Sequence, residues 1–208
     1  MPSPDDHRVT SIDQLEAIYG LPSGGAVLKE IDHINAQYRA FIEAAPFFTI
    51  ATCGPEGLDC SPRGDEPGFV RVADEKTLLI PDRRGNNRID SLRNIVRDPR
   101  VSLLFLVPGV GETFRIIGTA AISADPALRE SFVFAGKTPR SVIIVSVERV
   151  YFQCSKAIVR SRLWDPSRHV SRNSLPSTGT ILAAITKGEL GGEQYDREYP
   201  ERLKATIY

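Results

Sequence analysis

The 208-residue sequence is short of several features, and each shortage excludes a class of protein. Its 26 basic and 26 acidic side chains give a formal net charge of zero, so no general positive field attracts nucleic-acid backbones. Aromatic residues make up only 8%, which is also untypical of a nucleic-acid binder. No run of about eighteen apolar residues occurs, and the polar N-terminus lacks a signal-length apolar core. We therefore expect a cytoplasmic protein that binds neither nucleic acid nor membrane.

Cysteine is scarce as well. The three cysteines, Cys53, Cys60 and Cys154, form no CxxC pair and leave one unpaired, so the sequence predicts neither a zinc site nor a disulfide framework. The sequence shows no catalytic triad and no pair of catalytic carboxylates, so it identifies no catalytic residue.

The 41% of apolar residues suffices for a sizeable core, and the chain length favours one domain with appended helices. Helices are expected over residues 11–19 and 26–44. Short β runs separated mostly by turns predict a mainly β fold, an antiparallel barrel with peripheral helices. The strands are expected over residues 47–52, 60–72 (broken), 77–80, 101–107, 113–122 and 141–153. The run 100–107 lacks strict alternation, which predicts burial on both faces.

An arginine-rich helix follows the expected strand at 77–80. Asn87 reads as its N-cap, and Ile89, Leu92, Ile95 and Val96 recur at helical spacing. A helix N-terminus offers free N–H groups and a positive dipole end, so the nearby Arg83, Arg84 and Arg88 would make a phosphate site. The alternative is that these arginines are only the solvated face of an amphipathic helix.

Two strands carry unusual residues. The sequence Ser61-Pro62-Arg63-Gly64-Asp65 indicates either a bulge near a ligand or a protected edge strand. Alternation in the run 113–122 places Thr113 and Arg115 on one face, where Arg115 needs an anionic partner, either a carboxylate or a ligand.

A short helix is expected after the last strand. Lys156 and Arg160 are four residues apart, and Trp164, the only tryptophan, follows four residues later. These three side chains either clamp a planar anion or, in the case of Trp164, simply pack.

The residues from Leu15 to Pro166 resemble the flavoproteins related to pyridoxamine 5'-phosphate oxidase, which have an FMN-binding split β-barrel. The segments that carry the resemblance are SPRGDEPGFV (61–70), LLIPDRRGNNRIDSLRNI (78–95), PRVSLLFLVPG (99–109), ETFRIIGTA (112–120) and FQCSKAIVRSRLW (152–164). The resemblance implies a Greek-key-like barrel of six or more antiparallel strands, with an N-terminal helical segment over 1–45, the barrel over 46–166 and a helical tail over 167–208.

The resemblance also implies a homodimer with FMN bound in clefts between the subunits. Arg63 would lie on the strand that passes the flavin, and Ile80 and Pro81 would line its ring or ribityl chain. Asn87 and Arg88 would bind the phosphate, and Thr113 and Arg115 would reach the cofactor from the adjacent strand. A second subunit would contribute the remaining cofactor-binding residues, which are Lys156, Arg160 and Trp164.

The expected activity is that of an FMN-dependent oxidoreductase acting on a small molecule, because a flavin supplies its own redox chemistry. Residues 165–208 lack the family's Leu-x-Pro ending, so the oxidation of pyridoxamine 5'-phosphate itself is not expected. The sequence leaves open whether NAD(P)H or oxygen is the partner, and whether F420 or haem replaces FMN. It also leaves open a flavin- or haem-binding protein that stores or senses its ligand without turnover.

Overall fold

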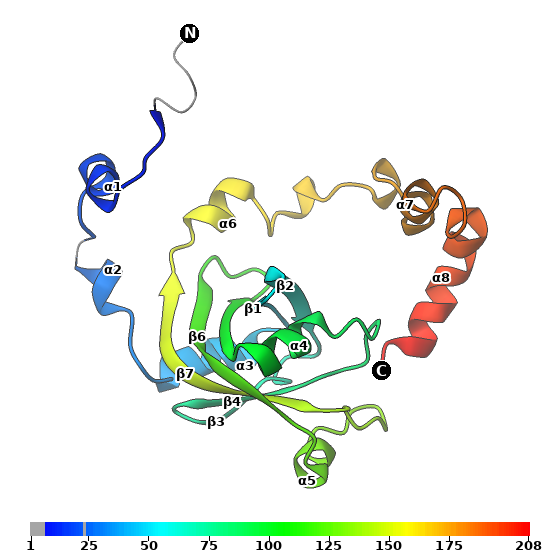
Figure 1. Ribbon diagram of the computed structural model, residues 1–208, viewed down its shortest axis with the longest axis horizontal. Helices are drawn as coiled ribbons and strands as arrows, with labels where there is room; N and C mark the ends of the chain where they lie inside the picture. The colour runs from blue at the N-terminus through cyan, green and yellow to red at the C-terminus, as the bar shows by residue number, and fades with distance from the viewer. Residues whose placement is uncertain (1–6, 23) are drawn as a thin grey trace.

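A computed structural model describes residues 7–22 and 24–208 of the chain, and predictions that concern residues 1–6 and 23 lie outside this part. Seven strands form one antiparallel sheet with helices at its periphery, as Figure 1 shows, which confirms the predicted mainly β class. The strands are β1 (Phe47–Gly54), β2 (Gly57–Gly64), β3 (Arg71–Asp74), β4 (Thr77–Pro81), β5 (Arg100–Leu106), β6 (Thr113–Ser123) and β7 (Val142–Gln153).

The strand order is β2-β1-β5-β6-β7-β4-β3. The two longest strands, β6 and β7, pair along their whole length, with a register shift between Ile117 and Gly118. A Cβ atom at Gly118 would lie 2.0 Å from the carbonyl oxygen of Ser146, so glycine is required at this point. The irregularity increases the bend of the two strands, as β-bulges do.

The strand β2 carries the Ser61–Asp65 motif and lies at one end of the strand order. Its pairing with β1 runs without a register shift from Gly57 to Gly64, and Pro62 lies opposite Thr49. The expected bulge is therefore absent from β2, and the edge-strand interpretation holds. Proline is tolerated at an edge because the missing N–H group leaves no inner ladder bond unmade.

The prediction that β5 is buried on both faces is wrong. Val101, Leu103 and Phe105 are buried, whereas the alternate residues are only half-buried. The strand β6 alternates in the same way, with Arg115 on the half-buried face and Phe114 in the core. The outer face of this part of the sheet therefore presents apolar side chains that the chain itself only partly covers, among them Leu104 and Ile117.

The barrel interior is filled by aromatic and branched side chains. Phe48 and Phe105 stack with ring centroids 4.9 Å apart, and both are almost fully buried. The helix α3 (Ala36–Ala44) closes one side of the barrel, where Phe41 stacks on Phe114 at 4.2 Å. Tyr38 meets the same ring edge-on at 5.4 Å, so α3 shares the core of the sheet.

Two helices precede α3, namely α1 (Ile12–Tyr19) and α2 (Gly25–Leu28), and none of their residues is buried. The helix expected over residues 26–44 is therefore broken after α2. Ile31 forms two backbone hydrogen bonds with Val150 of β7, of 3.1 and 2.8 Å, which a continuous helix would not allow. Asn35 then caps α3 by accepting a hydrogen bond from the Tyr38 backbone N–H at 2.8 Å.

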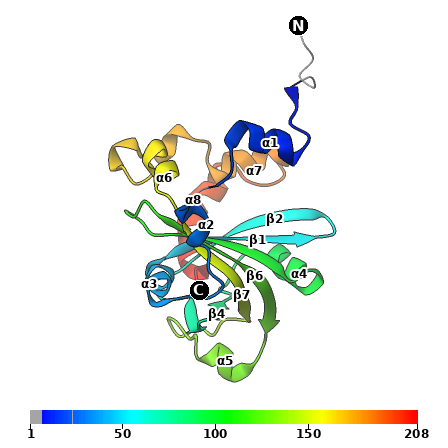
Figure 2. The same cartoon turned by 90° about the vertical axis from the view of Figure 1, so that its left-hand side faces the viewer.

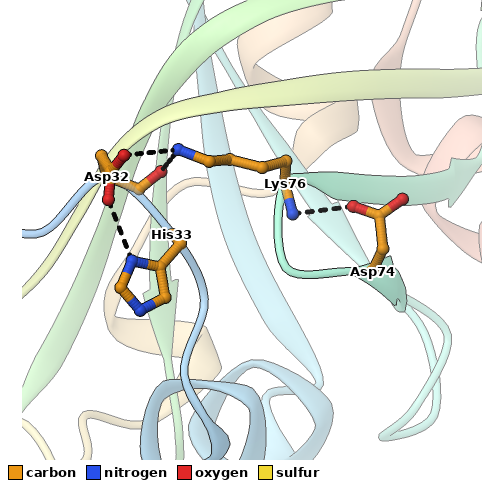
Figure 3. Close-up of polar contacts among 4 residues, drawn as sticks. All are labelled: Asp32, His33, Asp74 and Lys76. Atoms are coloured by element: carbon orange, nitrogen blue, oxygen red, sulfur yellow. Dashed lines mark hydrogen bonds and ion pairs between the residues drawn. The ribbon is translucent and has the colours of Figure 1, made fainter.

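A polar cluster holds the α2–α3 connection against the β3–β4 turn (Figure 3). The Lys76 ammonium donates to the Asp32 carboxylate at 2.8 Å and also to the Asp32 backbone carbonyl. His33 lies 2.9 Å from the other oxygen of Asp32, and the backbone N–H of Lys76 donates to Asp74 at 2.7 Å. The hydrogen bonds from Lys76 and His33 lower the pKa of Asp32 to about 2.

The peripheral helices outside the N-terminal segment border the barrel or form the tail. They are α4 (Asp90–Arg97), α5 (Pro126–Glu130), α6 (Lys156–Ser161), α7 (Thr178–Ile185), α8 (Gly192–Thr206) and the 3-10 turns η2 (Pro166–Arg168) and η3 (Arg172–Ser174). Figure 1 shows the tail arching from α6 over the barrel to α8, and Figure 2 shows the β1–β2 hairpin extending from one side. The division into segments 1–45, 46–166 and 167–208 stays a prediction.

Candidate functional site: a basic cleft beside β4 and α4

A cleft of about 720 Å³ opens between β2, the connection from β4 to α4, and the start of β7. Its charged lining residues are Asp59, Arg63, Asp82, Arg84, Arg88 and Arg140, together with Arg83 and Asp90. Five arginines and three aspartates thus border one open space. We refer to it below as the basic cleft.

The connection that forms one wall of the cleft runs from the end of β4 to Ile89 and contains unusual backbone. Asn87 and Ile89 have positive φ values of 62° and 53°. Such values are uncommon outside glycine and rare for a β-branched residue. The connection is held by its own polar groups, because Asn86 accepts the Arg88 backbone N–H at 3.0 Å and Asn87 accepts from Arg140 at 3.0 Å.

The predicted N-cap at Asn87 is wrong. The helix α4 begins at Asp90, with Ile89 at the cap position and no side chain accepting from the first turn. Asn87 takes the left-handed conformation, and its side-chain oxygen accepts a hydrogen bond from Arg140, so it does not cap the helix. The buried face of α4 also differs from the expected stripe, because Val96 is 77% exposed and the buried residues are Ser91, Asn94 and Ile95.

Arg63 projects from β2 into the cleft. Its side chain is mostly buried, and one of its N–H groups has no partner within the described part of the chain. Its Nη1 atom donates to Asp82 at 2.7 Å, and the two side chains are only 23% and 14% exposed. Its Nε atom is buried and has no hydrogen-bond partner among the described residues. Buried polar groups are almost always satisfied, so the partner of this N–H group is expected outside the described residues, in a water, a ligand or another chain.

The other arginines of the cleft divide into engaged and free groups. Arg83 donates to Asp65 at 2.6 Å and to the carbonyl of Phe132 at 2.8 Å, so it braces the loop rather than the ligand space. Arg88 is largely exposed and bonds to Asp90 at 2.8 Å, and this bond raises the pKa of Arg88. Arg84 is exposed and has no hydrogen bond or ion pair within residues 7–22 and 24–208.

Two predicted residues of β4, Ile80 and Pro81, are buried and do not line the cleft. They pair with Ile143 and Val142 of β7 and belong to the wall behind it.

Thr113 and Arg115 lie on β6, on the half-buried outer face, and do not border the basic cleft of the same chain. The partner of Arg115 is a neutral group, because its Nη1 atom donates to the Tyr151 hydroxyl at 3.1 Å. Its guanidinium carbon also lies 5.7 Å from the Tyr151 ring. The expected carboxylate partner is therefore absent within the described residues, and the ligand alternative stays open.

The third predicted group lies at the base of the tail. Lys156 and Arg160 are exposed on α6, and Trp164 lies beyond the helix, which ends where Arg162 turns left-handed with φ 51°. The Trp164 indole donates to the carbonyl of Val110 at 2.7 Å and is half-buried. None of these three side chains borders the cleft of its own chain.

Several cleft residues could not be expected from local patterns. Asp59 accepts hydrogen bonds from Ser61 at 2.9 Å and Ser91 at 3.0 Å and so joins β2 to α4. Asp82 joins the cleft from the position directly after β4, and Arg140 joins it from the loop before β7. The adjacent charge in Pro81-Asp82-Arg83-Arg84 was the only sequence signal for Asp82, and none marked Arg140.

More than half of the chain matches a known protein family. The family model described as pyridoxamine 5'-phosphate oxidase matches residues 34–154. No curated protein matches the chain. Among the described residues, no helix has the length and apolar content that crossing a membrane requires.

Similar solved structures cover little more than half of this chain. HupZ from Group A Streptococcus is 20% identical, covers 59% of this chain and 95% of its own, and has a TM-score of 0.49. A putative pyridoxamine 5'-phosphate oxidase from Lactobacillus delbrueckii is 19% identical, with 58% and 99% covered and a TM-score of 0.43. General Stress Protein 26 from Bacillus anthracis is 15% identical, with 54% and 88% covered and a TM-score of 0.41.

Proposed function

Because the chain belongs to the pyridoxamine 5'-phosphate oxidase family, we propose that it is an FMN-dependent oxidoreductase acting on a small organic substrate. FMN, when bound, supplies the hydride and electron transfer, so the chain needs only to hold it and admit a substrate. This agrees with a sequence that offers no triad or carboxylate pair.

The observation that carries the proposal is the unsatisfied Nε–H group of Arg63 in the basic cleft. A flavin offers carbonyl and ring nitrogen acceptors, and its phosphate is a dianion, so both the free donor and the free charge of Arg84 find partners on one ligand. The cleft volume of about 720 Å³ lies in the range of small-molecule and cofactor sites.

The residues that would hold FMN come from two groups, one on each copy of the chain. The first group borders the cleft and consists of Arg63, Arg84, Asn87 and Arg88, with the cationic members facing the phosphate. The left-handed Asn87 also turns the backbone at this point.

A second copy of the chain would complete the site. The proposal assigns to it the side chains that lie outside the cleft of their own chain, which are Thr113, Arg115, Lys156, Arg160 and Trp164. Support comes from the apolar outer face of β5 and β6, where Leu104 and Ile117 are only half-buried, and from the 39% exposed Phe47 on β1. Apolar surface of this kind is typical of subunit contacts.

The test begins with the visible spectrum of the purified protein and the mass of any ligand released by heat. A flavin spectrum with the mass of FMN supports the proposal, and anaerobic reduction by NADH or NADPH would identify the electron donor. Bound flavin that no nicotinamide and no substrate panel reduces would instead support a binding protein without turnover. A colourless protein that also fails to bind added FMN would refute both.

A further inference from the structure

The tail of the chain returns to the barrel at Tyr208. Figure 1 shows α8 running back toward the β4–α4 side of the sheet. Among the described residues, the only hydrogen bond that joins residues 169–208 to residues before 166 is made by Tyr208. No residue of α8 itself is buried. The contact at Tyr208 is therefore specific rather than part of a broad packed surface.

The phenol of Tyr208 is hydrogen-bonded to a buried carboxylate, that of Asp65. Its hydroxyl donates to Oδ1 of Asp65 at 2.8 Å, and Oδ2 of Asp65 accepts from Arg83 at 2.6 Å. The Asp65 side chain is only 2% exposed. The Tyr208 ring lies 5.0 Å from the ring of Phe134, which fixes it from the side. The hydrogen bond to Asp65, followed by burial, raises the pKa of the phenol.

Tyr208 also forms a wall of a second cavity, of about 330 Å³, that shares Asp82, Arg83, Arg84 and Arg140 with the basic cleft. Lys137 adds a further cation to this cavity. Tyr208 lines it, whereas Asp65 lies behind the phenol and does not. The four cations of the wall outnumber its one carboxylate, Asp82, which is already paired with Arg63, while the nearby Asp65 is covered and hydrogen-bonded.

We propose that Tyr208 is a positioning residue of the second cavity beside the basic cleft, where it covers Asp65 so that the carboxylate charge does not oppose an anion bound at the shared Arg83, Arg84 and Arg140. The identity of that anion as the FMN phosphate rests on the proposed function, whereas the covering of Asp65 does not. Loss of the phenol would expose a carboxylate to a cavity that otherwise attracts negative charge, and like charges close to each other weaken binding.

The test uses the full chain with Tyr208→Phe, Tyr208→Ala and the matched control Tyr199→Phe, which removes the hydroxyl of a tyrosine on α8 that lies away from the cleft. Affinities for FMN and for the uncharged riboflavin are measured by flavin fluorescence, and amide hydrogen exchange is followed in α8. Tyr208→Phe should accelerate exchange in α8 about tenfold, because one hydrogen bond to a charged group is lost. Tyr199→Phe should leave exchange and affinity unchanged.

The affinity measurements separate charge from shape. Tyr208→Ala should weaken FMN about tenfold and riboflavin less than twofold, and adding Asp65→Asn in that background should restore FMN binding, since the exposed charge is removed. Equal losses for FMN and riboflavin, or no rescue by Asp65→Asn, would overturn the proposal. Should the unmodified protein bind no FMN, the proposed function fails, and inorganic pyrophosphate serves as the probe for the same comparison.

Discussion

Replacing Arg63 by lysine isolates the one donor on which the proposed cofactor site depends. Lysine keeps a positive charge beside Asp82, so an ion pair with that half-buried carboxylate can still form. It removes the Nε–H group, which is buried and has no partner within residues 7–22 and 24–208. Hydrogen bonds that involve a charged group are worth about 1.5–3 kcal/mol. Because Arg63 is 23% exposed, we expect the lower part of this range.

A loss of about 1.5–2 kcal/mol corresponds to a 10- to 30-fold weaker FMN affinity, since each 1.4 kcal/mol is a factor of about ten. Fluorescence titration of FMN into the ligand-free protein measures this change directly. Arg71→Lys is the control, because Arg71 is an exposed arginine on β3 that bonds to Ser131 outside the cleft. An Arg63→Lys variant that binds FMN within twofold of the unmodified protein, at equal melting temperature, would refute the assignment of Nε to the ligand.

Two predictions concern stability rather than binding. Gly118→Ala should lower the free energy of unfolding by about 3 kcal/mol, the upper end of overpacking costs, because the new Cβ would lie 2.0 Å from the Ser146 carbonyl oxygen. Urea titration tests this, and Gly85→Ala, where no atom lies within 4 Å, should change it little. Asp32, whose pKa is lowered to about 2 by Lys76 and His33, contributes stability that is present above its ordinary pKa of 3.8 and lost as the pH falls through 2. Lys76→Met should therefore be less stable than the unmodified protein at pH 6 and approach it below pH 2, and an unchanged difference across this range would contradict the assignment.

Most of the barrel was predictable because its strands are punctuated by local signals. Gly54-Pro55-Glu56-Gly57 marks the β1–β2 turn, and alternation in Thr113–Ser123 assigns the faces of β6 correctly. The errors arose where long-range pairing overrode local pattern. The helix expected over residues 26–44 is interrupted because Ile31 pairs with Val150, a contact that no local sequence pattern indicates.

The candidate site was predictable only in part. Arg63 and the arginine-rich connection after β4 were identified from their charge and their position in the motifs. The start of α4 was not, because the left-handed backbone at Asn87 and Ile89 depends on polar contacts across the cleft, including one from Arg140. Tyr208 could not be found from the sequence either, since 143 positions separate it from Asp65.

The pairing of β7 has a consequence for the behaviour of the sheet in solution. β4 pairs only with the first part of β7, from Val142 to Ser146, while β7 continues to Gln153 along β6. The remaining edge of β7 would offer free N–H and C=O groups to the strands of other molecules. Ile31 occupies this edge at Val150, and the polar cluster at Lys76 holds the residues that follow it. The connection between α2 and α3 thus covers the free edge of β7 and hinders edge-to-edge pairing with other molecules. It does so through one bridged residue, Ile31, instead of an eighth strand.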